Sequence, residues 1–230
     1  KGSYPMTSLR EETKLELKKL KEMSWKDRIW YIWEYYKFHM LGLFMAFLAL
    51  STVGTVLYNQ TFTTRLAIAV VNDQKGGSLS PIEPELREAL GCTKKDLVEL
   101  NEGLHVDFEG GSSSQYDYAS LAKLSALTAS QSLDILIGDQ SAIFQYAAAS
   151  AYEPLTQLLT NDMYERLKDY ILMAPDETGT PQPVALSLKS TEFTAKTGID
   201  MDPPYLAVMA SSPRKEAALQ MISYLFPETP

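Results

Sequence analysis

Two short motifs in this chain contain the residue types that serine acyl-transfer enzymes use. Ser120 and Lys123 are spaced as in S-x-x-K, and Lys196 to Gly198 reads K-T-G. In such a site a neighbouring base takes the proton of the serine hydroxyl. No S-D-N motif lies between the two, and the interval is short for such an enzyme. The sequence therefore favours ordinary helix positions and no enzymatic activity, with a serine envelope hydrolase using Ser120 as the less favoured alternative.

The side chains that bind metals or form disulfides are scarce. Cys92 is the only cysteine, and His39 and His105 are the only histidines. An internal disulfide and a cysteine-rich metal site are therefore excluded. We expect His105 to be a structural residue within a strand, Cys92 to be inert, and the chain to use no metal or other cofactor.

Carboxylates follow or precede several predicted strands, where a pair of them could act as general acid and base. Nothing in their spacing indicates that any two converge. We expect them to cap helices or to face solvent in loops. The residues concerned are Asp107, Glu109, Asp134 and Asp139.

Polar residues also follow three predicted strands, and ligands of open parallel sheets bind beyond the carboxyl ends of the strands. The Gly/Ser-rich loop among them offers hydroxyl and N–H groups to an anionic or polar ligand, close to the start of a helix. A flexible surface loop is the alternative. The predicted ligand-binding residues are Asn72, Asp73, Gly111, Ser112, Ser113, Ser114, Asp139 and Gln140.

Apolar runs and helical patterns alternate along the second part of the chain. We expect strands in 65–71, 104–108, 132–139, 182–188 and 204–211. We expect helices in 81–91, 118–130 and 141–152, two short ones in 153–172, and a last one capped by Ser212 and ending before Pro227. This order predicts an α/β domain with a mostly parallel sheet and helices on both faces.

The segment 40–58 has nineteen residues and no charged side chain. As a helix it would be about 28 Å long, close to the roughly 30 Å of a bilayer's hydrocarbon core. A signal peptide would have a shorter apolar region at the extreme N-terminus, and a buried soluble helix would not explain the aromatic residues before it. These residues are typical of a membrane interface, and they include Trp25, Trp30, Trp33 and Tyr36.

Charge predicts the orientation of this span. Residues 1–39 carry nine Lys or Arg against six Asp or Glu, whereas residues 40–230 carry twelve against twenty-three. The positive-inside rule therefore predicts a cytoplasmic N-terminus and an extracytoplasmic C-terminal domain, and the acidity of that domain argues against nucleic acid as a partner. The predicted order is a cytoplasmic charged helix or tether (1–22), an interfacial aromatic helix (23–39), a transmembrane helix (40–58), a linker (59–64) and the extracytoplasmic α/β domain (65–230).

One stretch of the second part resembles the first lobe of extracytoplasmic solute-binding proteins of ABC importers, and a later stretch resembles their closing strand and helix. They are "LDILIGDQSAIFQYAAASAYEPLTQLL" and "YLAVMASSPRKEAALQMISYLF". Those proteins have two lobes, but 161–201 is too short for a second one, so the resemblance implies a single, reduced lobe. The arrangement is also similar to small single-pass proteins of clostridial Gram-positive bacteria that share the "WEYYKFH" type of juxtamembrane sequence.

The resemblance and the predicted span together imply a membrane-anchored binding or accessory subunit of a membrane assembly, such as an ABC transporter. The expected partners are membrane lipid, an integral membrane protein and a small polar ligand. A structural or sensor module that binds another protein is the alternative, and in that case the aromatic residues before the span would contact a protein.

Overall fold

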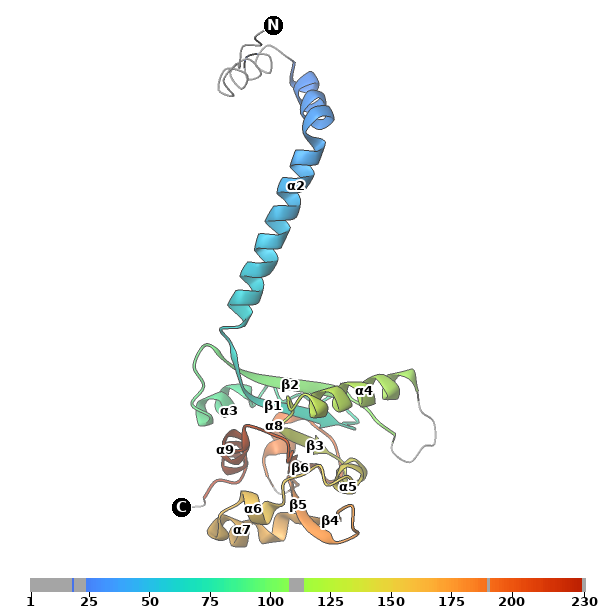
Figure 1. Ribbon diagram of the computed structural model, residues 1–230. Coiled ribbons are helices and arrows are strands. Elements are labelled where there is room, and N and C mark those ends of the chain that lie inside the picture. Colours follow the sequence, from blue (N-terminus) through green and yellow to red (C-terminus); the bar gives the residue numbers. More distant parts are fainter. Residues whose placement is uncertain (1–17, 19–23, 108–113, 190, 229–230) are drawn as a thin grey trace, which may run out of the picture. The chain divides into compact units, whose positions relative to one another are not determined.

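The computed structural model describes residues 18, 24–107, 114–189 and 191–228 (Figure 1). The chain divides into two units, Lys1–Thr61 and Phe62–Pro230, and each is considered by itself. The predicted charged helix or tether in 1–22 lies outside the described residues, apart from Lys18, which is helical and exposed.

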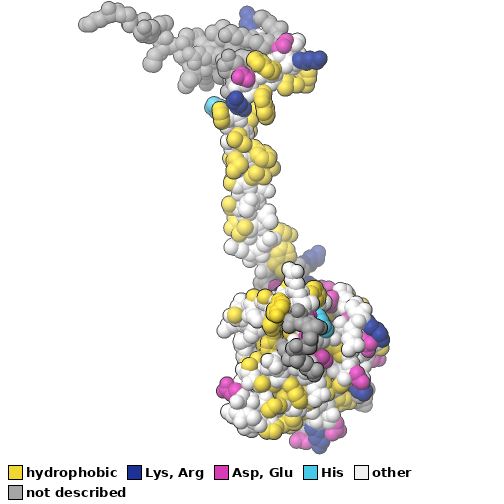
Figure 2. Space-filling view, turned by 90° about the vertical axis from the view of Figure 1, so that its right-hand side faces the viewer, with side chains coloured by type: hydrophobic (Ala, Val, Ile, Leu, Met, Phe, Trp, Pro, Cys, Tyr) yellow, Lys and Arg dark blue, Asp and Glu magenta, His cyan; other side chains and the backbone are white. Residues whose placement is uncertain are grey.

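The first unit contains one long helix, α2 (Trp25–Asn59), which begins after the N-cap Ser24. The sequence predicted two helices here, an interfacial one and a span, but the structure has no interruption between them. Within α2 the segment Lys37–Asn59 is long and apolar enough to cross a membrane, with a mean hydropathy of 2.1, and none of it is buried. Figure 2 shows hydrophobic side chains along this part of the helix and charged ones at its N-terminal end.

The second unit is built on one six-stranded sheet with the order β2-β1-β3-β6-β5-β4. Its strands are β1 (Thr63–Val71), β2 (Asp96–Leu104), β3 (Ile135–Gly138), β4 (Ile171–Pro175), β5 (Pro181–Ser187) and β6 (Tyr205–Val208). β1 pairs in parallel with β2 and β3, whereas β6 pairs antiparallel with β3 and β5, and β4 antiparallel with β5. β1, β2, β3 and β5 therefore run in one direction and β4 and β6 in the other, so the sheet is mixed but most of its strands share a direction.

Helices cover both faces of this sheet, as predicted. They are α3 (Glu83–Ala89), α4 (Gln115–Ala129), α5 (Gln140–Ala147), α6 (Leu155–Leu158), α7 (Asn161–Leu167), η1 (Lys168–Tyr170), α8 (Phe193–Thr197) and α9 (Lys215–Leu225). One apolar core joins the sheet to α3, α6, α8 and α9, and a second joins it to α4 and α5. Figure 1 shows α3 and α9 on one side of the sheet and α4 and α5 on the other.

The interior strand β1 contributes side chains to both cores. Leu66, Ile68 and Val70 contribute to the first core, and Ala69 and Val71 to the second. A strand with helices on both faces must be apolar at every position, so it reads as a continuous hydrophobic run.

Three elements differ from the prediction. The strand expected in 104–108 ends at Leu104 and lies earlier, as the edge strand β2, whose many polar residues conceal the alternation. The end of the helical pattern expected in 153–172 includes the start of β4 instead. The short helix α8 was not predicted at all, because five residues are too few to show a period.

The start of the last helix also differs. Ser212 was expected to cap it, but α9 begins at Lys215, and its N-cap Arg214 makes no side-chain cap hydrogen bond. The Ser212 hydroxyl instead donates to Asp134 Oδ1 at 2.6 Å and accepts from the backbone N–H of Arg214 at 3.0 Å. The predicted buried face of this helix is confirmed, since Ala217, Met221 and Leu225 are all buried.

Candidate functional site

At the carboxyl ends of the parallel strands, the structure brings together two of the predicted ligand-binding residues. Asn72, which has a positive φ of 65°, follows β1, and Asp139 follows β3. The Asn72 Nδ2 group lies 3.3 Å from both carboxylate oxygens of Asp139. Asn72 Oδ1 also accepts the N–H of Val106 at 2.9 Å, and Asp139 caps α5 by accepting the N–H of Ala142 at 2.9 Å. These side chains therefore hold the strand ends and α5 together.

The other predicted ligand-binding residues do not converge on that pair. Asp73 accepts the N–H of Gly77 within its own loop and, at 2.7 Å, the N–H of Asp200, so it joins this loop to the segment before β6. Ser114 is the N-cap of α4, in a capping box with Asp117. Gln140 is the exposed first residue of α5. Gly111, Ser112 and Ser113 lie outside the described residues.

The two acyl-enzyme motifs lie on opposite faces of the sheet. Ser120 belongs to α4, which packs on the second core, and its buried hydroxyl accepts the N–H of His105 at 3.2 Å. Thr197 belongs to α8 on the first core, where its hydroxyl donates to the Phe193 carbonyl at 2.8 Å. Residues on opposite faces cannot act on one acyl group, so this geometry does not build a serine acyl-transfer site.

The predictions for three other residues have mixed outcomes. Asp139 caps a helix as expected, but Asp134 does not face solvent in a loop. It is fully buried and accepts from Arg214 Nε at 2.7 Å. His105 is exposed and follows β2 instead of lying within a strand.

Within 24–107, 114–189 and 191–228, no three His, Cys, Asp or Glu side chains are placed to hold a metal ion.

A concave site lies elsewhere, on the sheet face covered by α3 and α9. It is a pocket of about 520 Å³, within the range of roughly 300–1,000 Å³ typical of small-molecule sites. None of the predicted ligand-binding residues lines it. The lining residues are Ile82, Arg166, Leu167, Tyr170, Thr191, Glu192, Phe193, Lys196, Tyr224, Leu225, Phe226 and Pro227.

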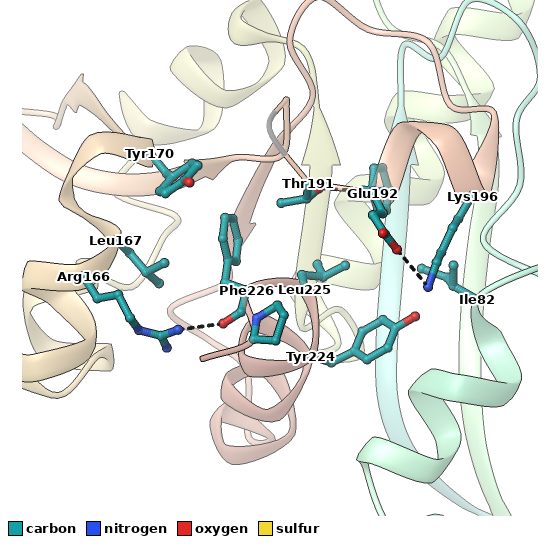
Figure 3. Close-up of a pocket in the computed structure, with 12 residues that line it drawn as sticks. Ile82, Arg166, Leu167, Tyr170, Thr191, Glu192, Lys196, Tyr224, Leu225 and Phe226 are labelled. Atoms are coloured by element: carbon teal, nitrogen blue, oxygen red, sulfur yellow. Dashed lines mark hydrogen bonds and ion pairs between the residues drawn. The ribbon is translucent and has the colours of Figure 1, made fainter. Parts of the chain in front are cut away.

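One side of the pocket is formed by α7 and η1 packed against the end of α9 (Figure 3). The rings of Tyr170 and Phe226 meet edge to face, with centroids 5.2 Å apart. Arg166 Nη1 donates to the backbone carbonyl of Phe226 at 2.9 Å. Arg166 itself is exposed, whereas the neighbouring lining residue Leu167 is buried.

The other side carries a network centred on a carboxylate just outside the pocket. Glu85 Oε2 accepts from the Tyr224 hydroxyl at 2.6 Å and lies 3.0 Å from Lys196 Nζ, which is also 3.4 Å from Glu192. Burial and the hydrogen bond to Glu85 raise the pKa of Tyr224 to about 12. The hydrogen bond from Tyr224, followed by the one from Lys196, lowers the pKa of Glu85.

Comparison with known proteins gives no assignment for this site. None of the comparisons with protein-family models, curated proteins and solved structures found a match.

Sequence reasoning missed the pocket because its residues are far apart in the chain. Arg166, Lys196 and Tyr224 belong to three different helices, and Ile82 precedes a fourth. These residues meet only when the sheet and its helices are assembled. Helix α9 gave a weak indication of the pocket. Ala217 and Met221 on its apolar face are buried, but the large aromatic residue Tyr224 that follows them is only half-buried.

Proposed function

We propose that this chain is a single-pass membrane protein whose α/β domain acts, without catalysis, as a binding or accessory subunit of a membrane assembly such as an ABC transporter. Its reduced binding-protein-like lobe lies outside the cytoplasmic membrane, and the pocket between α7, α8 and α9 holds its ligand. The expected partners are lipid, an integral membrane protein and a small ligand.

The apolar segment Lys37–Asn59 is the observation that carries this proposal. Its large side chains are exposed along the whole segment, for example Leu43 at 75% and Leu50 at 73%. Exposed apolar surface of this extent is unfavourable in water and favourable in a bilayer.

The polar residues within this segment also suit a bilayer. The Thr52 hydroxyl donates to the Leu48 carbonyl at 2.8 Å, and the Thr55 hydroxyl to the Ser51 carbonyl at 2.9 Å. Polar groups in hydrocarbon must be satisfied internally, and these two donors are satisfied within the helix.

The aromatic residues before the segment support an interfacial position. Trp25, Trp30 and Trp33 are all largely exposed on α2, whereas the side chain of Tyr36 is not described. Indole rings favour the headgroup layer. Together with the basic residues before the span, they support a cytoplasmic position for this end of the helix.

Extraction of membranes at alkaline pH tests the anchor. We expect the intact chain to stay in the membrane pellet after carbonate washing. A variant with Leu48→Lys and Leu50→Lys should be released, because each lysine at the centre of a span costs about 2.5–3.5 kcal/mol. Recovery of the unaltered chain in the supernatant would exclude the anchor.

Purification of the complex tests the accessory role. When the chain is isolated from native membranes in mild detergent, we expect a multi-span membrane protein in a fixed molar ratio. A chain that purifies alone after chemical crosslinking in the membrane would contradict the accessory role without affecting the anchor.

The sensor alternative is favoured by one observation, the short connection between the units. Helix α2 ends at Asn59 and β1 begins at Thr63, so only three residues connect the span to the sheet. A photo-crosslinker placed at Trp33 distinguishes the two functions. Lipid adducts alone are expected for the accessory subunit, and a protein adduct at Trp33 for the sensor.

A further inference from the structure

We infer that the pocket between α7, α8 and α9 binds a small organic carboxylate with an aromatic or branched apolar body, and that Arg166 binds the carboxylate group. This inference rests on the binding role proposed above. It assigns the chemical class of the ligand and the residue that recognises it.

Of the charged residues that line the pocket, Arg166 is the one available to bind an anionic group. Of its two lining cations, Lys196 is paired with both Glu85 and Glu192. Among the described residues, Arg166 makes no ion pair with a carboxylate, and its guanidinium group donates to the neutral carbonyl of Phe226. An anionic group of the ligand therefore finds its uncompensated counter-charge at Arg166.

The geometry of Arg166 suits a carboxylate in particular. A guanidinium group has five N–H donors in a planar fork, and the Phe226 carbonyl engages Nη1 at 2.9 Å. The remaining donors can form the paired hydrogen bonds that carboxylates accept. Because the Phe226 bond already restrains the group, less conformational freedom is lost when a ligand binds.

The walls of the pocket define the rest of the ligand. Leu167, Phe193 and Phe226 are each at most 6% exposed, and the Tyr170 ring stands beside that of Phe226. In Figure 3 the ring of Phe226 lies between Arg166 on one side and Lys196 on the other. The rings of Tyr170 and Tyr224 line the pocket and are only half-buried. An apolar body next to the carboxylate would cover what they leave exposed, and an aromatic one would also pair with these rings.

Three probes with the same phenyl group and different end groups test this inference: 3-phenylpropionate, 3-phenylpropan-1-ol and 3-phenylpropylamine. Their affinities are measured by calorimetry on the full chain in nanodiscs of a zwitterionic lipid, with empty nanodiscs as the blank. We expect the carboxylate to bind at least about tenfold more tightly than the alcohol, as one charged hydrogen-bonded pair allows, and the amine to bind most weakly.

Two variants localise the effect. Arg166→Gln should weaken carboxylate binding about tenfold and change alcohol binding less than about twofold, since only the charged contact is lost. Lys168→Gln removes a nearby exposed cation, 3.4 Å from Glu165, that does not line the pocket, and it should leave all three affinities unchanged.

The possible results separate the two proposals. Equal affinity for the three probes, or equal weakening of all of them by Arg166→Gln, would overturn the assignment of the carboxylate to Arg166. Absence of all binding by a chain that stays in washed membranes would overturn this inference and leave the anchor in place. Release of the chain from the membrane would overturn the proposed function itself.

Discussion

Arg214 donates from Nε to Asp134 Oδ2 at 2.7 Å, and the carboxylate that accepts this bond is fully buried. The same carboxylate accepts the Ser212 hydroxyl at 2.6 Å and the backbone N–H of Ala67 at 2.7 Å. Arg214 also donates to the Ser132 carbonyl at 3.1 Å. The Asp134 side chain thus connects the interior strand β1 to the segments that precede β3 and α9.

Asp134→Asn should therefore be strongly destabilising. It removes the counter-charge of Arg214, and breaking a buried ion pair costs about 3–5 kcal/mol; because Arg214 keeps some contact with solvent, we expect about 3 kcal/mol. The free energy of unfolding of the detergent-solubilised chain in urea measures this loss.

Asp202→Asn is the matched control. Asp202 pairs with Lys189 at 3.4 Å, but its side chain is 90% exposed. Exposed pairs contribute little, so a change within about 0.5 kcal/mol is expected. Similar losses in the two variants would show that burial of the Asp134 pair does not matter.

The raised pKa of Tyr224, about 12, predicts a dependence of stability on high pH. The folded state holds this proton more tightly than the unfolded state, whose tyrosine has a pKa near 10. The stabilising contribution is therefore complete below about pH 10 and is lost as the pH rises through about 12. Difference absorbance between the wild type and Tyr224→Phe isolates this phenol, and a midpoint near 10 would show that the bond to Glu85 is not formed.

Loss of the hydroxyl group should change the free energy of unfolding differently at Tyr152 and at Tyr116. The Tyr152 hydroxyl is buried without a hydrogen-bond partner among the described residues, whereas the Tyr116 hydroxyl donates to the Gly103 carbonyl. Tyr152→Phe should leave the free energy of unfolding unchanged or raise it by about 1 kcal/mol, and Tyr116→Phe should lower it by about 0.5 kcal/mol. A clear loss of stability in Tyr152→Phe would indicate that this hydroxyl has a partner.

Ser120 should not react with covalent serine probes. Its side chain is 3% exposed, and its hydroxyl accepts the His105 N–H. We expect a fluorophosphonate to label the wild type no more than Ser120→Ala, as judged by intact mass. Labelling that disappears in the alanine variant would revive the hydrolase alternative.

The sequence predicted well the elements that are buried on both sides or strongly punctuated. β1 and β3 are short apolar runs closed by polar residues, and α9 has a regular apolar face. The edge strands were the difficulty. β2 carries charged residues, and β4, which has one buried residue, directly follows a helical pattern.

The sites were predictable only where chain topology alone brings residues together. Asn72 and Asp139 end neighbouring parallel strands, so their proximity follows from the sheet. Arg166 and Phe226 meet through packing of α7 against the end of α9, which no local pattern specifies. The charge of Arg166 was visible in the sequence, but the lack of a carboxylate partner in the described structure was not.

The most direct test of the membrane arrangement is labelling of single cysteines in whole cells. Replacing Cys92 with serine leaves a chain without cysteine, into which Lys18→Cys or Glu177→Cys is introduced at exposed positions on the two sides of the apolar segment. With a maleimide that does not cross membranes, we expect Glu177→Cys to be labelled in intact cells and Lys18→Cys only after permeabilisation. Labelling of Lys18→Cys in intact cells, or equal protection of both cysteines, would contradict an anchor with an extracytoplasmic domain.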